Sequence, residues 1–504
     1  MVLGIDLGTT YSVAAYVDEN GNPQAVYNSE GDTTTPSVVY FEDEKNAVVG
    51  QTAKDFMTTE PQKVISTVKN AMGEDRVYSP IDGMSLKPQD ISSLVLRKLV
   101  KDAENFLGGK EKITDVVVTV PAYFTDAQRR ATNEAVKLAG LNLLSNINEP
   151  TAAAVFYAHK SKMQETNTLV FDLGGGTFDV TIMHIKDEIV EVKSTRGLKN
   201  VGGSFFDQQL VDYICEKFEE THGIDLEDEE YIDVYQSLFE KVEIAKKQVC
   251  KTKTKTIIPI NAGMNKDRID ITYDYFVEII SKLCDKIENL VKMAVSDAGF
   301  NVENIDQVIM VGGSSRIPYI EERITNLMGK NPLKVVNPDE VVALGAAIQA
   351  DKLAKNAANN VKDVCSHGLG FKRYSPKADE QINEVLIKRN TQVPVTTKED
   401  TRFAFARDNQ NCLQVVVTEG DYDDVLYSVV IKELQFDLPD GIKRGMKYAL
   451  NMLVDAQQNI SVSLRIPDLN VEMMLDVRNQ AKSEELSVEI SAEQLEMLQN
   501  IYIA

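Results

Sequence analysis

Two hydrophobic patterns alternate along the first two thirds of the chain. Short runs rich in Val and Ile are separated by longer stretches in which apolar residues recur every three or four positions. This alternation is typical of strands and amphipathic helices in α/β layers. The clearest helices are predicted over residues 88–107 and 274–298, and a glycine, Gly108 or Gly299, ends each of them. We therefore expect an α/β fold up to about residue 355.

The pattern changes after about residue 385. Apolar and polar residues now alternate in short segments, most clearly in 460–466 and 471–477. Such alternation indicates strands with one buried face, and a series of them predicts an antiparallel β-sandwich.

The two textures and the length of 504 residues predict several domains, because a single core of that size is uncommon. The segment between them is polar, contains small residues and shows no sustained period, as expected of a linker. We expect an α/β domain over 1–355, a linker over 356–370, a β-sandwich over 371–490 and a truncated C-terminal helix over 491–504.

Composition narrows the class of protein. Hydrophobic residues make up 43% of the chain, charged residues make up 26%, and no apolar run approaches the roughly 18 residues of a membrane span. No signal peptide precedes the first predicted strand at Val2, so we expect a cytoplasmic protein without a membrane partner. Five scattered cysteines without a C-x-x-C pair favour reduced thiols. The net charge of −23 argues against nucleic acid as a partner.

One short motif occurs twice. Residues 3–12 (Leu-Gly-Ile-Asp-Leu-Gly-Thr-Thr-Tyr-Ser) and 169–179 (Leu-Val-Phe-Asp-Leu-Gly-Gly-Gly-Thr-Phe-Asp) both join an apolar run to Asp-Leu-Gly and a hydroxyl residue. A strand that turns back there places a carboxylate, backbone N–H groups and hydroxyls at a hairpin tip, where glycine lets the backbone approach an anion. Because a carboxylate repels phosphate, the motif implies Mg²⁺ between them, held through waters. One copy alone is equally consistent with an ordinary hairpin turn, but two copies predict a polyphosphate gripped from both sides.

Three further segments suit the same site. Residues 308–317 read as a buried strand that opens into a turn of small residues, which a flat ring or a ribose can approach closely. Residues 148–154 and 339–347 read as helix starts in which acids precede small residues, so two helices can pack closely where two halves meet. Neither a G-x-x-x-x-G-K-[ST] loop nor a G-x-G-x-x-G turn is present.

In this order, the segments resemble the nucleotide-binding core shared by actin, sugar kinases and seventy-kilodalton heat-shock chaperones. The chaperone branch, DnaK-like in particular, is the most similar over nearly all of residues 1–355. The matching stretches are Ile5-Asp-Leu-Gly-Thr-Thr-Tyr-Ser12, Val120-Pro-Ala-Tyr-Phe124, Ile147-Asn-Glu-Pro-Thr-Ala-Ala-Ala154, Phe171-Asp-Leu-Gly-Gly-Gly-Thr-Phe-Asp179, Val311-Gly-Gly-Ser-Ser-Arg-Ile-Pro318 and Asn337-Pro-Asp-Glu340. The sandwich resembles that family's peptide-binding domain through 388–391, 408–410 and 441–445. The fold implied is an actin-like duplicated ATPase core of two lobes, followed by an antiparallel β-sandwich.

By position, the resemblance also implies a site for ATP or ADP with Mg²⁺, and K⁺ as a further ion. Asp6 and Asp172 would hold the metal shell. The implied catalytic residues are Lys69, Glu149, Asp172, Thr177 and Asp179. The implied nucleotide contacts are Asp6, Gly8, Thr9, Thr10, Tyr11, Gly174, Gly175, Gly202, Gly203, Glu243, Lys246, Lys247, Cys250, Gly312, Gly313, Ser314, Arg316 and Asp339.

The chain departs from the family pattern at several places. Lys247 stands where the family stacks an arginine on adenine and Cys250 replaces a serine, so we expect lower nucleotide affinity. Ser145 lies where many members carry an arginine used with J-domain partners, so J-domain cochaperones and nucleotide-exchange factors stay open as partners. Residues 364–368 (Val-Cys-Ser-His-Gly) replace a leucine-rich linker, and we expect weak apolar docking there. We also expect no long helical lid after Ser491.

The resemblance also implies a site for unfolded or extended apolar peptides in the sandwich. Phe371, Phe403, Leu413 and Val415 would line its hydrophobic pocket, and Tyr374 with Ala406 would form an arch over the peptide backbone. The alternative is that these residues belong to an ordinary sandwich core.

Three functions remain at this point. The first is a Mg·ATP-dependent chaperone that hydrolyses ATP, slowly, to control the binding of apolar peptides. The second is a nucleotide-binding assembly or sensor protein whose sandwich binds one dedicated partner with little ATP turnover. The third, a sugar kinase on the same core, is disfavoured by the β-rich C-terminal third.

Overall fold

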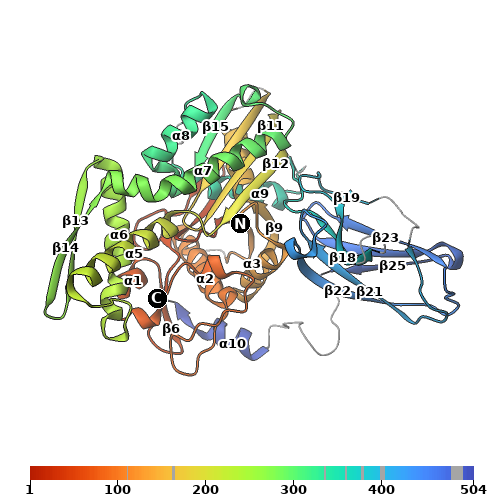
Figure 1. The fold of residues 1–504 in the computed structure, drawn as a ribbon, viewed down its shortest axis with the longest axis horizontal. Coiled ribbons are helices and arrows are strands. Elements are labelled where there is room, and N and C mark those ends of the chain that lie inside the picture. Colours follow the sequence, from red (N-terminus) through yellow and green to blue (C-terminus); the bar gives the residue numbers. More distant parts are fainter. Residues whose placement is uncertain are drawn as a thin grey trace.

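The computed structural model describes residues 1–109, 112–161, 165–333, 337–357, 360–375, 380–397, 403–477 and 492–503. Two α/β lobes lie side by side and a β-sandwich extends from them (Figure 1). None of the described helices is long and apolar enough to cross a membrane. All five cysteines are free.

The first lobe is built on a sheet of order β3-β2-β1-β8-β9. β1 forms an antiparallel hairpin with β2, and β8 lies parallel to β1 on its other side. Helices α2 and α3 cover this sheet, and α2 matches the helix predicted over 88–107. The bounds are β1 Val2–Asp6, β2 Tyr11–Val17, β3 Pro23–Ala25, β8 Asp115–Val120, β9 Asn142–Asn148, α2 Pro88–Phe106 and α3 Asp126–Leu138.

A smaller sheet completes the first lobe. It has the order β26-β6-β5-β7, with α1 beside it and the 3₁₀ turn η3 after β7. The bounds are β5 Val39–Phe41, β6 Asn46–Val49, β7 Val64–Ile65, α1 Gln51–Asp55, η3 Val68–Ala71 and β26 Tyr502–Ile503. One strand of this sheet therefore comes from the C-terminal end of the chain.

The second lobe repeats the first arrangement. β10 forms an antiparallel hairpin with β11, β15 lies parallel to β10 on its other side, and the sheet order is β15-β10-β11-β12-β16. This repetition explains why the Asp-Leu-Gly motif occurs twice: each copy ends the first strand of an equivalent hairpin. The bounds are β10 Thr166–Leu173, β11 Thr177–Lys186, β12 Ile189–Lys199, β15 Gln307–Val311 and β16 Val361–Lys362.

Helices and one further hairpin surround the second lobe. The helix predicted over 274–298 is α7, which ends before Gly299, where φ is 74°. The bounds are α5 Gly203–His222, α6 Ile232–Thr252, β13 Lys255–Ala262, β14 Asn265–Thr272, α7 Tyr273–Asp297 and α8 Pro318–Met328.

Two helices of small residues pack between the lobes, as the sequence predicts. They are α4 (Glu149–Ser161) and α9 (Val341–Ala354). A Cβ added to Gly345 of α9 would lie 1.8 Å from the carbonyl oxygen of Ala152 in α4, so only glycine fits there. This close crossing fixes how the two lobes face each other.

The C-terminal region is an antiparallel sandwich. One sheet has the order β18-β17-β21-β22; the other has the order β19-β23-β24-β25, with β20 paired to β23. β24 and β25 match the predicted strands over 460–466 and 471–477. The bounds are β17 Leu369–Ser375, β18 Glu380–Ile387, β19 Val395–Thr396, β20 Phe403–Ala404, β21 Cys412–Glu419, β22 Val429–Asp437, β23 Lys447–Val454, β24 Ile460–Ile466 and β25 Val471–Asp476.

The segment before the sandwich is docked on the lobes. β16 adds a parallel strand to β12, and Val364 and Cys365 are buried. Ser366 and His367 hydrogen-bond to the carbonyl oxygens of Ala122 and Tyr123. The sequence predicts weak apolar docking, but Val364 packs into the apolar cluster formed by the two lobes, and hydrogen bonds and strand pairing also hold this segment.

The C-terminal segment forms a short helix and then a strand. Helix α10 (Ala492–Asn500) is followed by β26, which pairs with β6 of the first lobe. Figure 1 shows the C-terminal end beside β6, away from the sandwich. The predicted helix is present, but its strand was not predicted; Ser491, the predicted cap, lies outside the described residues.

Candidate functional site

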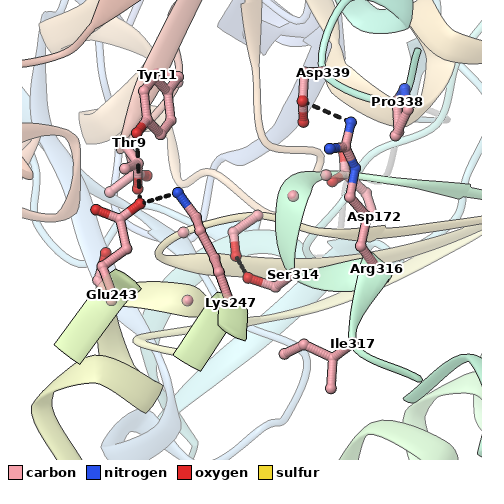
Figure 2. A pocket seen from close by; sticks show the side chains of 18 of the residues that line it. Thr9, Tyr11, Asp172, Glu243, Lys247, Ser314, Arg316, Ile317, Pro338 and Asp339 are labelled. Atoms are coloured by element: carbon pink, nitrogen blue, oxygen red, sulfur yellow. Dashed lines mark hydrogen bonds and ion pairs between the residues drawn. The ribbon is translucent and has the colours of Figure 1, made fainter. Parts of the chain in front are cut away.

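A cavity of about 870 Å³ lies between the two lobes, and both Asp-Leu-Gly turns open into it (Figure 2). Its lining includes nearly every residue that the sequence predicts for a nucleotide: Asp6, Gly8, Thr9, Thr10, Tyr11, Lys69, Glu149, Asp172, Gly174, Gly175, Thr177, Gly203, Glu243, Lys246, Lys247, Cys250, Gly312, Gly313, Ser314, Arg316 and Asp339. Segments far apart in the sequence therefore meet at one site.

Two predicted residues, Asp179 and Gly202, are not among the residues that line the cavity. Asp179 lies opposite Asp172 in the β10–β11 hairpin, and its Oδ1 accepts a hydrogen bond from the Tyr123 amide at 3.0 Å. A Cβ on Gly202, where φ is 139°, would lie 2.4 Å from the Gly174 carbonyl oxygen. Both residues therefore support the second turn from behind.

Glycines let the two turns approach each other. A Cβ on Gly8 would lie 1.9 Å from the Tyr11 carbonyl oxygen, and a Cβ on Gly175 would lie 2.2 Å from Thr10 Oγ1. A side chain at Gly8 would clash within its own turn, and a side chain at Gly175 would fill the space between the two turns. The backbone N–H groups and hydroxyls of both turns can therefore face the same anion.

Buried charges gather at the deep end of the cavity. Lys69 Nζ lies 2.5 Å from Glu149 Oε1, and Thr119 Oγ1 donates to Asp6 Oδ1 at 2.9 Å. Burial, followed by the charge of Glu149, raises the pKa of Asp6 to about 7 and that of Asp179 to about 8. The same two causes raise the pKa of Asp172 well above its usual range. The cluster holds more negative charge than Lys69 balances.

This excess of carboxylates fits a bound divalent cation, because a cation would stabilise their ionised forms. Among the described residues, no group of three His, Cys, Asp or Glu is placed to hold a metal ion directly. Mg²⁺ commonly keeps several waters and uses few protein ligands. The donor set therefore fits hydrated Mg²⁺ near Asp6 and Asp172.

An ion pair joins the two lobes beside the cavity. Lys54 of α1 lies 2.6 Å from Glu243 Oε2 of α6, so it joins the first lobe to the second. Figure 2 shows Glu243 between Tyr11 and Lys247, whose Nζ lies 2.6 Å from Glu243 Oε1. Despite the opposing effect of burial, Lys54 and Lys247 lower the pKa of Glu243 to about 2.

Another wall carries Arg316 and Asp339, which form an ion pair at 2.7 Å (Figure 2). Ser314 Oγ donates to the Gly174 carbonyl oxygen at 2.8 Å. Cys250 also lines the cavity, and Figure 2 shows Lys247 and Arg316 on opposite sides of it, so a flat base entering here would meet Lys247 on one side and Arg316 on the other.

Several lining residues were not predicted. They are Thr34, Ser204, Asp207, Lys251, Lys253, Ile317, Pro318, Pro338 and Val342. Two of them could have been suspected from the sequence, because Thr34 stands in a run of three threonines and Ser204 directly follows the Gly202-Gly203 pair. Asp207 pairs with Lys246 at 2.7 Å, a contact that only the packing of α5 on α6 reveals.

The predicted peptide-site residues divide into two groups. Phe371 and Val415 are buried in the sandwich core, with Phe403 and Leu413 packed against it. Tyr374 and Ala406 are exposed. Their neighbours 376–379 and 398–402 lie outside the described residues, so the pocket and the arch stay predictions.

The sequence of the chain was compared with models of known protein families. It matches the family described as Hsp70 protein over residues 2–81 and 75–500. The match extends through both lobes and the sandwich and reaches α10. The structure agrees with this match, because it has two equivalent lobes, a cavity between the lobes and a C-terminal sandwich. The chain belongs to the Hsp70 family.

Proposed function

We propose that this chain is a DnaK-like chaperone that hydrolyses Mg·ATP to control the binding of extended apolar peptides to its sandwich. Hsp70 proteins are ATP-dependent chaperones that bind ATP or ADP with Mg²⁺. The observation that carries the proposal is the convergence of both Asp-Leu-Gly turns, Lys69 and Glu149 in one cavity.

In this proposal, the glycine-rich turns bind the phosphates. The Gly8 N–H donates to Ser12 Oγ and the Gly174 N–H donates to the Thr177 carbonyl oxygen, and these bonds hold the shape of the two turns. Other backbone N–H groups of the turns, with the hydroxyls of Thr10 and Thr177, would donate hydrogen bonds to the β and γ phosphates. Bound Mg²⁺ neutralises charge on the phosphate oxygens. Asp6 and Asp172 would accept hydrogen bonds from its waters.

Lys69 and Glu149 would then act on the γ phosphate. The ammonium group of Lys69 places positive charge where charge builds up on the phosphate oxygens, which lowers the barrier. Glu149 holds that ammonium at 2.5 Å and has a second carboxylate oxygen with which to orient the attacking water. Asp179, behind the cavity wall, would contribute through Asp172 and through the Tyr123 backbone.

A short route connects this chemistry to the sandwich. Asn148 directly precedes Glu149, and its Nδ2 donates to Asp363 Oδ2 of the docked linker at 2.8 Å. Arg129 Nη2 donates to Asn148 Oδ1 at 2.8 Å. A change in the position of Glu149 therefore reaches the linker through one residue, which supports coupling between hydrolysis and peptide binding.

The alternative is an assembly or sensor protein whose sandwich binds one dedicated partner, with little turnover. The burial of Phe371 and Val415 in the core favours it, because buried side chains contact a peptide only after rearrangement. J-domain cochaperones and nucleotide-exchange factors stay proposals for partners. Ser145 donates from its Oγ to the Asn146 carbonyl oxygen at 2.9 Å, and a serine cannot replace the charge of an arginine.

ATP turnover with and without an unfolded apolar peptide tests the proposal. We expect slow hydrolysis that rises several-fold with peptide, and a Lys69→Ala protein measured in parallel gives the background rate. A hydrolysis rate that does not change with added peptide would favour the alternative function, in which the sandwich binds one dedicated partner. No hydrolysis above the Lys69→Ala rate would overturn the ATPase assignment.

A further inference from the structure

The C-terminal segment, defined here as residues 492–503, lies on the first lobe although it follows the sandwich in sequence. Its strand β26 pairs in parallel with β6, with Tyr502 beside Asn46 and Ile503 beside Ala47. The Tyr502 amide donates to the Lys45 carbonyl oxygen at 2.7 Å. The segment therefore extends a sheet whose other strands come from residues 39–65.

Apolar side chains of the segment complete the core of that lobe. Leu498, Ile501 and Ile503 are each no more than 4% exposed. They belong to the same apolar cluster as Phe41 of β5 and Val68, the residue before Lys69. The core beside the catalytic turn η3 is thus built partly from the far end of the chain.

Polar side chains of α2 recognise the backbone of the segment. Arg97 donates to the carbonyl oxygens of Leu498, Gln499 and Ile501, and Lys101 donates to that of Ile503. The carbonyls of Leu498 and Gln499 belong to the last turn of α10, where a helix leaves carbonyls without intrahelical donors, and those of Ile501 and Ile503 follow the helix. The two cations therefore supply donors along the whole end of the segment.

One side-chain pair sets the position of the helix. Gln494 Nε2 lies 3.0 Å from both carboxylate oxygens of Asp90, at the start of α2. Strand pairing, three buried apolar side chains and these polar contacts together have the features of a peptide bound by strand addition.

We propose that the groove between α2 and β6, the α2–β6 groove, is a recognition site for the C-terminal segment, which binds there as a ligand within the same chain. Binding would tie the end of the sandwich to the first lobe. Residues 478–491 join Val477 to the segment, and 14 extended residues reach at most about 50 Å. The sandwich is then attached at two points, the docked linker and this groove.

Hydrogen–deuterium exchange on the full chain tests the proposal. Ile501→Asp places a charge in the buried contact, and Gln499→Asp introduces the same charge at an exposed position as the matched control. We expect Ile501→Asp alone to speed exchange at least 10-fold at residue 502 and in β6. Exchange in the linker residues 361–369 should also rise, because the sandwich loses its second attachment.

A second variant and an added peptide separate recognition from loss of folding. Arg97→Gln keeps the apolar contacts and should give a smaller increase at the same amides. A synthetic peptide of residues 490–503, added to the Ile501→Asp protein, should restore slow exchange in β6, whereas the same peptide with Ile501→Asp should not. Unchanged β6 exchange, or no rescue by the first peptide, would overturn the recognition site. Unchanged exchange at 361–369 would overturn the attachment of the sandwich.

Discussion

Lys69 Nζ contacts Glu149 Oε1 at 2.5 Å in the closed end of the cavity, and both residues are buried. Lys69 comes from η3 of the first lobe, whereas Glu149 begins α4. Burial alone would lower the pKa of Lys69, but the nearby charges of Glu149 and Asp6 outweigh it and raise the pKa. The ammonium group therefore stays charged where the proposed reaction needs positive charge.

Replacing Lys69 by alanine should abolish most ATP turnover. Loss of one positioned charge at a developing negative charge typically costs about 100- to 1,000-fold in rate, and we expect a decrease in kcat of that size. Steady-state phosphate release measures it. Lys282→Ala is the matched control, because Lys282 lies at an exposed position of α7 and is not among the residues that line the cavity. Equal turnover in Lys69→Ala and the parent protein would remove the catalytic role.

The parts of the fold that local patterns determine could be predicted from the sequence. Helix α2 runs over Pro88–Phe106, against the predicted 88–107, because its apolar residues recur at the helical period. β24 runs over Ile460–Ile466 as predicted, because alternation there marks one buried face. The two Asp-Leu-Gly turns could be found because they repeat.

Contacts between distant segments could not be predicted in the same way. The buried residues Leu498, Ile501 and Ile503 are spaced by three positions and then by two, so no sustained period marks the strand, and β26 gains its partner from residues near position 46. Asp179 lies in the second motif, but the motif does not tell which side chains face the cavity. Asp207 contacts Lys246 only because α5 packs on α6.

Any side chain at Gly345 should destabilise the protein, because α4 and α9 cross closely there. A Cβ there would lie 1.8 Å from the Ala152 carbonyl oxygen, so the helices must separate. We expect Gly345→Ala to lower the free energy of unfolding by about 3 kcal/mol, at the upper end of overpacking effects. Denaturant unfolding measures the change.

Gly313→Ala is the control for that substitution. A Cβ at Gly313 would lie 3.8 Å from Asp339 Oδ1, an ordinary contact, so the change in unfolding free energy should stay small. If both alanine variants unfold at the same denaturant concentration as the parent protein, the close crossing does not limit stability.

The ion pair between Lys54 and Glu243 should slow the release of nucleotide. It joins the two lobes beside the cavity at 2.6 Å, and Glu243→Gln removes the negative charge while keeping the shape of the side chain. We expect ADP to dissociate about 10-fold faster, which corresponds to a free-energy barrier for release that is lower by about 1.4 kcal/mol. Stopped-flow release of a fluorescent ADP measures this rate.

Glu278→Gln removes the same charge from an exposed position on α7 and serves as the control for net charge. Its release rate should equal that of the parent protein. An unchanged rate in Glu243→Gln would mean that the lobes open without breaking this pair.

Two acidic residues meet where the sandwich contacts the first lobe. The Asp126 amide of α3 donates to Glu419 Oε2 of β21 at 3.3 Å. Burial, followed by the charge of Asp126, raises the pKa of Glu419 from 4.5 to about 7, although Arg129 and Lys199 oppose this shift. The folded protein thus binds this proton more tightly than the unfolded chain does.

Stability contributed by Glu419 should therefore be present at low pH and lost as pH rises from about 4.5 to about 7. Glu419→Gln cannot ionise, so its advantage over the parent protein should grow through this window by about 3 kcal/mol, at 1.36 kcal/mol for each pKa unit. Denaturant unfolding at pH 5 and pH 8 measures the difference. The half-buried His367 lies nearby, and its titration contributes equally to both proteins. Glu433→Gln, at an exposed position of β22, should differ from the parent by the same amount at both pH values. A constant difference for Glu419→Gln as well would show that Glu419 is ionised in the folded protein throughout.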